Sequence, residues 1–211
     1  MPTKTIIKVC GLTRLDEARA CSELGVQWLG FNCFRGSKRY LPPEAIATII
    51  QKLPPEVKTV GVFVNSSATE IEKILQQTGL HLAQLHGDES KSFCKEVSDF
   101  CNVIKAFRID KNFDMNSIEV YSNFCKYYLF DTLTKSYGGS GKKFNWDIIL
   151  KYSHKKDFIL SGGLSIESIK EIVNIKKKLP NLIGIDINSK FEIRPGLKDT
   201  QTIKKFIKSI K

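Results

Sequence analysis

Short apolar runs alternate with amphipathic segments along the chain, and this pattern predicts its secondary structure. Eight runs are apolar almost throughout, as expected of strands in a parallel sheet that helices cover. The predicted strands are residues 6–10, 28–31, 59–64, 80–85, 103–106, 127–130, 158–160 and 182–185. Consecutive strands lie roughly 25 residues apart, and the segments between them are long enough for a crossover helix.

The helix limits carry their own signals. Thr13 is expected to cap the first helix, with Asp16 and Glu17 in its first turn. Gly25 and Gly79 are expected to end helices, because glycine readily adopts the left-handed conformation found there. Further helices are predicted around residue 118, over 146–150 and over about 166–175.

Eight strand–helix units predict the α/β class and a single-domain (β/α)8 TIM barrel. The chain has 211 residues, near the lower end of the roughly 200–250 residues typical of such a barrel. We therefore expect residues 1–211 to form one domain. An open, doubly wound sheet is the alternative, because a count of short strands can be wrong by one.

The charge balance is strongly basic. Lys and Arg number 33 against 22 acidic residues, a formal net charge of +11, and most of the basic residues are lysines. They are spread over predicted helix faces and the C-terminus instead of being interleaved with aromatic residues. This pattern argues against a nucleic-acid-binding module, which stays the alternative from another class. A basic field still attracts an anionic small molecule.

The cysteines and histidines do not form a metal motif. The chain has six cysteines without a C-x-x-C pair and three histidines without zinc-type spacing, so we expect no metal site. We expect the cysteines to be reduced and the protein to be cytoplasmic. No apolar run reaches the roughly 18–20 residues of a membrane span, so no membrane association is expected.

The strand ends carry the candidate chemistry, because barrel enzymes place catalytic groups at the C-terminal ends of their strands. Cys10 ends the first strand, where nearby backbone N–H groups favour a lowered thiol pKa; a small buried hydrophobic residue is the alternative. Asp131 ends the sixth strand and suits a proton donor. His86 could be a base, but a hydrogen-bonded structural role at a turn is the favoured interpretation.

The ends of the last two strands fit a phosphate site. Gly162 and Gly163 follow the seventh strand, and Asp186, Asn188 and Ser189 end or follow the eighth. These barrels commonly hold phosphate there with backbone N–H groups and a helix N-terminus. A plain turn explains the two glycines equally well.

A glycine-rich loop follows the sixth strand. Residues 138–142 lack the spacing of a nucleotide-binding P-loop, and no G-x-G-x-x-G follows the first strand, so no nucleotide cofactor is expected. We interpret residues 135–143 as a lid over the barrel mouth.

Together these motifs resemble one known family, phosphoribosylanthranilate isomerase. The resemblance runs in order along nearly the whole chain. It is carried by Lys8-Val9-Cys10-Gly11-Leu12-Thr13, Ser37-Lys38-Arg39-Tyr40, Gly61-Val62-Phe63-Val64-Asn65, Gln84-Leu85-His86-Gly87-Asp88-Glu89, Phe130-Asp131-Thr132, Gly138-Gly139-Ser140-Gly141-Lys142, Leu160-Ser161-Gly162-Gly163-Leu164 and Pro195-Gly196-Leu197-Lys198-Asp199.

The resemblance implies an Amadori rearrangement in tryptophan biosynthesis. N-(5-phosphoribosyl)anthranilate would become 1-(2-carboxyphenylamino)-1-deoxyribulose 5-phosphate. It implies Asp131 as general acid, Cys10 as general base and Arg39 as the partner of the anthranilate carboxylate. The remaining substrate-binding residues would be Gly162, Gly163, Asp186, Asn188 and Ser189. A small phosphosugar substrate is implied and no cofactor or metal; monomer and homodimer both stay open.

Two stretches depart from the family pattern. The segment after the eighth strand has Asn188-Ser189-Lys190 where the family usually has Ser-Ser-Gly, so either the phosphate grip is altered or Lys190 adds charge to it. In the loop after the second strand, residues 32–37 lack the usual Pro-Lys, and Arg35 could replace that lysine. Within the enzyme class, the rival is another phosphosugar barrel such as a ribulose-phosphate epimerase, which would need metal ligands that the strand ends do not supply.

Overall fold

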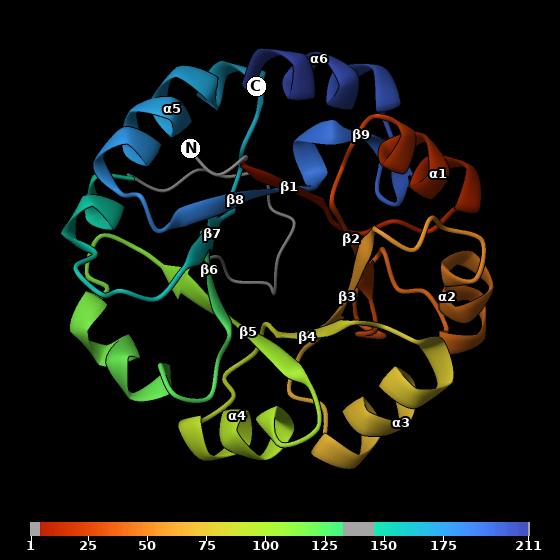
Figure 1. Cartoon of the computed structure of the whole chain (residues 1–211), viewed down its shortest axis with the longest axis horizontal. Helices are drawn as coiled ribbons and strands as arrows, with labels where there is room; N and C mark the ends of the chain where they lie inside the picture. The colour runs from red at the N-terminus through yellow and green to blue at the C-terminus, as the bar shows by residue number, and fades with distance from the viewer. Residues whose placement is uncertain (1–4, 133–145, 211) are drawn as a thin grey trace.

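A closed ring of eight parallel strands organises the computed structural model, which describes residues 5–132 and 146–210 (Figure 1). Each strand pairs with the next, and β8 pairs with β1, so that the described barrel has no free edge. The strands are β1 (Ile6–Val9), β2 (Trp28–Asn32), β3 (Lys58–Phe63), β4 (Leu82–Leu85), β5 (Asn102–Ile109), β6 (Tyr127–Thr132), β7 (Phe158–Leu160) and β8 (Leu182–Ile187).

Helices surround the ring of strands in Figure 1. The α-helices are α1 (Leu15–Glu23), α2 (Pro43–Ile50), α3 (Ala68–Thr78), α4 (Lys91–Ser98), α5 (Ile169–Lys178) and α6 (Thr200–Ile210). The short 3-10 helices are η1 (Met115–Tyr121), η2 (Trp146–Lys151), η3 (Ile166–Ser168) and η4 (Ser189–Phe191). A hairpin of β9 (Glu192–Arg194) and β10 (Leu197–Lys198) lies between η4 and α6.

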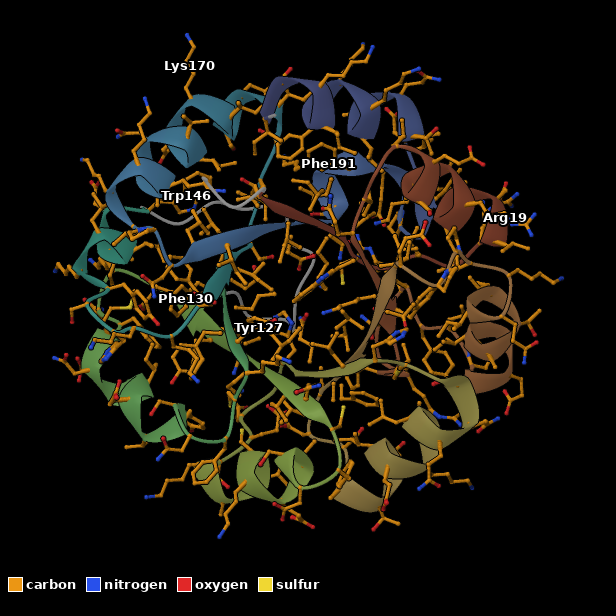
Figure 2. The ribbon with its side chains drawn as sticks, viewed as in Figure 1. Arg19, Tyr127, Phe130, Trp146, Lys170 and Phe191 are labelled. Carbon is orange, nitrogen blue, oxygen red and sulfur yellow. The ribbon has the colours of Figure 1, made fainter. Side chains whose placement is uncertain are left out.

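The core has two layers. The larger one lies between strands and helices and includes Phe130 and Phe191, whereas Arg19 and Lys170 extend outward from the helices (Figure 2). The smaller one fills the inside of the barrel and includes Trp28, Leu82, Leu129 and Ile159. Because side chains alternate along a strand, residues two positions after such an interior residue also face the inside. The next interior positions are nearer the barrel mouth, and several of them are polar: Gln84, Asp131 and Ser161.

The predicted barrel and its eight strands are confirmed, and the open sheet is excluded for the described chain. Two predicted crossover helices, around 118 and over 146–150, are 3-10 helices in the structure. A third begins as η3 and continues as α5. Such tight turns are used in short pieces where a connection has little length. Gly79 ends α3 in the left-handed conformation, with φ of 73°, as predicted.

The predicted cap of α1 is wrong. Arg14 is the N-cap residue of α1, and its side chain makes no capping hydrogen bond. Thr13 lies one position earlier, and its hydroxyl donates instead to the carbonyl of Gly196, 2.6 Å away. This bond connects the start of α1 to the β9–β10 hairpin. The hydroxyl that the local sequence pattern assigned to a helix cap therefore makes a tertiary contact instead.

Two further expectations concern the loop after β6 and membrane association. The lid proposed for residues 135–143 lies outside the described residues. Within the described ranges, no helix has the length and apolar character needed to cross a membrane.

Candidate active site

A cavity of about 330 Å³ opens at the C-terminal ends of the barrel strands. Its walls bring together every residue predicted for the site, although they are spread over most of the chain. Those residues are Cys10, Arg39, Asp131, Gly162, Gly163, Asp186, Asn188 and Ser189. Closure of the barrel therefore gathers strand ends that are far apart in sequence around one space, as expected for barrel enzymes.

Cys10 follows β1 directly and is buried. Its backbone N–H donates to the carbonyl of Ile187, 3.0 Å away, which continues the β1–β8 ladder by one residue. Gly30 lies behind the thiol: a Cβ at that position would come within 2.8 Å of the Cys10 sulfur. The absence of a side chain on β2 thus leaves the space that the thiol occupies.

Lys8 is the residue that sequence reasoning missed beside Cys10. It is fully buried inside the barrel, and its ammonium lies 2.9 Å from Oδ1 of Asp186. Burial works to lower the pKa of Lys8, but Asp186 and Cys10 outweigh it, so the pKa is raised and the lysine stays charged. The signal was present in the sequence, because positions 8 and 10 of one strand share a face.

The expectation of a lowered pKa for Cys10 is wrong. Burial is the largest influence and raises the pKa of the thiol, while the nearby charges of Lys8 and Lys198 oppose it. Cys10 is consequently a thiol with cations positioned to stabilise the thiolate when it forms, and not a permanently ionised group.

Asp131 lies in β6, on the inward-facing register of Leu129. Its Oδ1 accepts a hydrogen bond from the backbone N–H of Thr132 at 2.8 Å, and its Oδ2 lies 3.1 Å from Nε2 of His86. His86 therefore holds the candidate acid, which supports the favoured structural interpretation of this histidine. Gly162 also lies close: a Cβ there would be 2.7 Å from the Thr132 nitrogen and 3.1 Å from Oδ1 of Asp131.

Arg39 lies in the loop after β2, and its guanidinium is held by Glu192 of β9. Nε is 2.9 Å and Nη2 is 2.5 Å from the Glu192 carboxylate, a fork-shaped pairing. Glu192 also accepts from Lys198 at 2.7 Å, and Lys198 donates to the side-chain oxygen of Asn188 at 2.8 Å. Burial works to raise the pKa of Glu192, but Arg39 and Lys198 outweigh it and hold the pKa low.

Glu192 and Lys198 were not predicted as site residues. Lys198 is buried, and burial lowers its pKa against the opposing effect of Glu192. No local pattern identifies Glu192, because its role depends on the β9–β10 hairpin reaching the loop after β2. Two cations share one carboxylate here, so one positive charge is left over for an anionic ligand.

The turn after β7 has the shape expected of an anion site. Gly162 and Gly163 have φ values of 88° and 64°, a left-handed conformation that side chains disfavour. Asn188 precedes η4 and Ser189 begins it, just after the neighbouring strand β8. Glycine is not required at position 190, since Lys190 does not have a positive φ; its side chain is exposed and does not line the cavity.

Arg35 does not replace the lysine that the family pattern leads one to expect in this loop. It is exposed, lies over the ring of Tyr40 at 5.6 Å, and does not line the cavity. Lys38 of the same loop does line it. In the ranges 5–132 and 146–210, no cluster of three or more His, Cys, Asp or Glu side chains could hold a metal ion.

A (β/α)8 barrel whose mouth combines a thiol, a carboxyl group and excess positive charge defines an acid–base enzyme for an anionic substrate. The comparisons with known proteins agree. The sequence matches the family described as N-(5'phosphoribosyl)anthranilate (PRA) isomerase over residues 7–209. It is 40% identical over 207 residues to the N-(5'-phosphoribosyl)anthranilate isomerase of Phocaeicola vulgatus, covering 98% of each chain.

Solved structures agree as well. The phosphoribosyl anthranilate isomerase from Thermotoga maritima matches with a TM-score of 0.89 at 36% identity, covering 98% of both chains. Another solved isomerase, with a TM-score of 0.86 and 33% identity over 98% of both chains, is in complex with reduced 1-(o-carboxyphenylamino)-1-deoxyribulose 5-phosphate. The chain belongs to the phosphoribosylanthranilate isomerase family.

Proposed function

We propose that Cys10 is the general base and Asp131 the general acid in the isomerase reaction of this family. The chain is an isomerase that converts N-(5-phosphoribosyl)anthranilate to 1-(2-carboxyphenylamino)-1-deoxyribulose 5-phosphate, a step of tryptophan biosynthesis. The single observation that carries the residue roles is that Cys10 and Asp131 line one cavity from strands separated by β7 and β8. A substrate between them can take a proton on one side and lose one on the other.

The reaction needs these two proton transfers. Asp131 gives its proton to the furanose ring oxygen, the bond from C1 to that oxygen breaks, and the anilino nitrogen supplies the electron pair that makes a Schiff base. The thiolate of Cys10 then removes the proton from C2, and those electrons form the C1–C2 double bond of an enolamine. Return of a proton to C1, with loss of the proton of the C2 hydroxyl, gives the aminoketose.

The thiol environment supports the base role. Burial raises the pKa of Cys10, and a more basic thiolate removes a carbon-bound proton more readily once formed. Lys8 and Lys198 offset part of the cost of the buried negative charge. The acid role is supported by the contacts of the two oxygens of Asp131: the backbone N–H of Thr132 donates to Oδ1 and stabilises the carboxylate left after proton donation, and Nε2 of His86 lies against Oδ2.

We assign the substrate's two anionic groups to two different sets of residues at the cavity wall. Arg39, whose guanidinium Glu192 holds in place, would pair with the anthranilate carboxylate, and the buried ammonium of Lys198 would add to the positive charge behind it. Gly162, Gly163, Asn188 and Ser189 would take the phosphate with their backbone N–H groups. Asp186 would act next to them through its ion pair with Lys8.

Turnover of phosphoribosylanthranilate, followed by loss of its anthranilate-type fluorescence, tests this proposal. We expect Cys10→Ala and Asp131→Asn each to lower kcat by about 10²–10⁴-fold, the usual contribution of a positioned acid or base. Cys21→Ala is the matched control, since Cys21 is buried in α1 away from the cavity lining. Full activity in either site variant would remove that residue from its role.

The remaining expectations belong to the same proposal. We propose one domain over residues 1–211, a cytoplasmic location, and a monomer or homodimer that light scattering would distinguish. No nucleic-acid partner is proposed; fluorescence anisotropy showing tight binding of an oligonucleotide at physiological salt would overturn this.

A further inference from the structure

Gln84 of β4 is a buried amide that the acid–base pair does not use. It is 1% exposed, lines the cavity, and has its Nε2 atom 2.7 Å from Nδ1 of His86. Its Oε1 atom is buried without a hydrogen-bond partner. Gln84 and His86 both face the inside of the barrel, because Leu82, two residues earlier, belongs to the interior layer.

The geometry points to Gln84 as a positioning residue that fixes the imidazole tautomer of His86 and, through it, the hydrogen bond to Asp131. Gln84 Nε2 can only donate, so Nδ1 of His86 must accept and carry no proton. The proton of the neutral ring is then on Nε2, which donates to Oδ2 of Asp131 at 3.1 Å. This inference rests on the proposed role of Asp131 as the general acid.

The opposite orientation of the Gln84 amide is disfavoured. It would leave an NH2 group with two donors buried where the unpartnered oxygen now lies, and an unpaired buried donor is rarer than an unpaired carbonyl. It would also turn the lone pair of His86 Nε2 toward a carboxylate oxygen of Asp131. The oxygen of Gln84 therefore stays without a hydrogen bond because the NH2 group of the same amide points at Nδ1 of His86.

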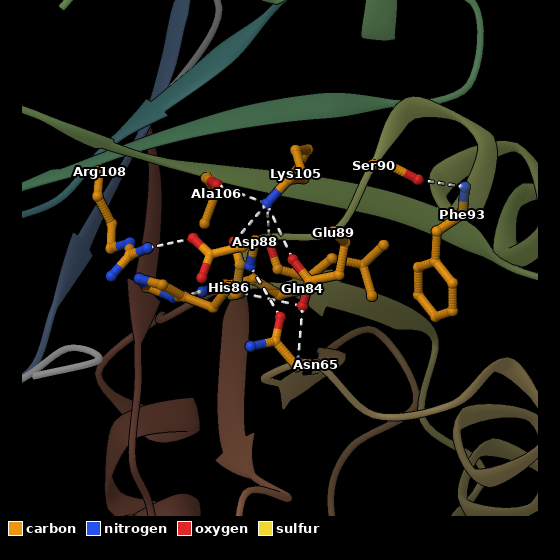
Figure 3. A network of polar contacts seen from close by, with 12 residues as sticks. Asn65, Gln84, His86, Asp88, Glu89, Ser90, Phe93, Lys105, Ala106 and Arg108 are labelled. Atoms are coloured by element: carbon orange, nitrogen blue, oxygen red, sulfur yellow. Dashed lines mark hydrogen bonds and ion pairs between the residues drawn. The ribbon is translucent and has the colours of Figure 1, made fainter.

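Hydrogen bonds hold the main chain around His86 in place, so the orientation of the imidazole ring depends on its own side-chain contacts. Lys105 of β5 donates to the carbonyl of Gly87 at 2.9 Å and to Glu89 at 2.9 Å. Glu89 accepts in turn from the backbone N–H groups of Gly87 and Asn65, both at 3.0 Å (Figure 3). The loop after β4 is held from β3 and β5, which leaves Gln84 and Asp131 to orient the imidazole.

The charged groups that surround the pair are themselves paired. Asp186 of β8 forms an ion pair with Lys8 of β1, and Asp186 is close enough to Asp131 and His86 for their charges to act on it. On β5, Lys105 is bonded to Glu89 and Arg108 to Asp88. Among the described residues, Gln84 and Asp131 are thus the side chains that face the two nitrogens of His86, and Gln84 is the one that keeps the proton off Nδ1.

Two-dimensional ¹H–¹⁵N spectra of the histidine rings test the tautomer directly, and the chain has only three histidines to assign. In the free wild-type enzyme at its working pH we expect His86 as the Nε2–H tautomer. A ring protonated on Nδ1, alone or together with Nε2, would overturn the inference. This measurement involves no turnover, so its result is separate from that of the Asp131→Asn assay, which tests the proposed function.

Gln84→Met, of similar length but without a hydrogen-bond donor, tests the consequence for catalysis. We expect the His86 signals to show both tautomers or their average, and kcat to fall about tenfold with KM within about twofold, because one hydrogen bond to the acid is weakened. The limb of the pH–kcat profile that reports the acid should move to higher pH. Unchanged kcat and an unchanged tautomer would overturn the inference.

Gln27→Met is the matched control for loss of a glutamine. Gln27 precedes β2 at the other end of the barrel, where its side chain accepts from the backbone N–H of Ile7 at 2.8 Å. We expect this variant to lose stability while keeping the wild-type His86 tautomer and pH profile. A displacement of the acid limb in the control equal to that in Gln84→Met would assign the effect to general loosening and overturn the inference.

Discussion

The ammonium of Lys8 and the carboxylate of Asp186 meet at 2.9 Å inside the barrel, on the two strands that close it. The same ammonium opposes the rise in the pKa of Cys10 that burial causes. One lysine thus connects the closure of the barrel to the chemistry of its mouth.

Lys8→Gln should raise the pKa of Cys10 further, because glutamine can still donate to Asp186 but carries no charge to stabilise the thiolate. The base must be ionised to act, so kcat/KM at neutral pH should fall in proportion to the thiolate fraction and recover at higher pH. The pH profile of kcat/KM, together with the pH dependence of alkylation at Cys10 followed by mass spectrometry, measures the rise in the thiol pKa.

Lys105→Gln is the control for that variant. Lys105 is also a buried, paired lysine, but its charge is directed to Glu89 and nearby carbonyls of the β4 loop. We expect it to lower stability without moving the Cys10 titration. An equal rise of the thiol pKa in both variants would show that Lys8 has no special influence on Cys10.

Glu192→Gln should weaken substrate binding and lower the stability of the fold, and the remaining stability should depend less on acid pH. It leaves Arg39 and Lys198 without their shared carboxylate, and breaking a buried ion pair costs about 3–5 kcal/mol. With Arg39 no longer held in place, KM should rise more than kcat falls. Steady-state kinetics and urea unfolding of the variant measure the two effects.

The pH dependence of that loss follows from the direction in which the Glu192 pKa is moved. This pKa is held low in the folded protein, so the stabilisation is complete above the ordinary glutamate pKa of about 4.3 and is lost as the pH falls through the folded value. The stability difference between wild type and Glu192→Gln should therefore be largest near neutral pH and shrink in acid. Glu56→Gln, at an exposed position, is the control for loss of a surface carboxylate, and an equal loss of stability there at neutral pH would contradict the role of the buried pair.

Gly162→Ala should lower kcat by about tenfold or more, since a 1 Å displacement of a catalytic group can cost still more. The added Cβ would crowd Thr132 and Oδ1 of Asp131, and the φ of 88° disfavours any side chain. Gly79→Ala is the control, because Gly79 also has a positive φ but open space for a Cβ. It should lose stability and keep kcat; similar kcat losses in both would contradict the steric explanation.

Thr13→Val should cost about 1 kcal/mol of stability, the usual net value of one hydrogen bond, by removing the donor to Gly196. Because the β9–β10 hairpin carries Glu192 and Lys198, KM should also rise modestly. Thermal unfolding and steady-state kinetics measure both. A stability loss with an unchanged KM would show that the hairpin keeps its position without this bond.

Each kind of prediction made from sequence succeeded or failed for a physical reason. The strands were found because a parallel barrel buries both faces of every strand, which makes each one an apolar run. Cys10, Asp131 and Gly162 line the cavity, as their positions at strand ends predict, because the ends of parallel barrel strands meet at one mouth. Thr13 was misassigned because its hydroxyl serves a residue far along the chain, which no local capping rule considers.

The sequence by itself determined the eight alternating units, the barrel that they close, and the strand ends at which a thiol, a carboxyl group and two glycines stand. Only the tertiary structure decided what surrounds those groups: Lys8 and Lys198 beside Cys10, His86 and Gln84 behind Asp131, Glu192 on Arg39. Local pattern reflects burial and backbone geometry, which act over neighbouring residues. The pKa of a buried group depends on charges and dipoles within a few ångströms, and the fold brings those from distant parts of the chain.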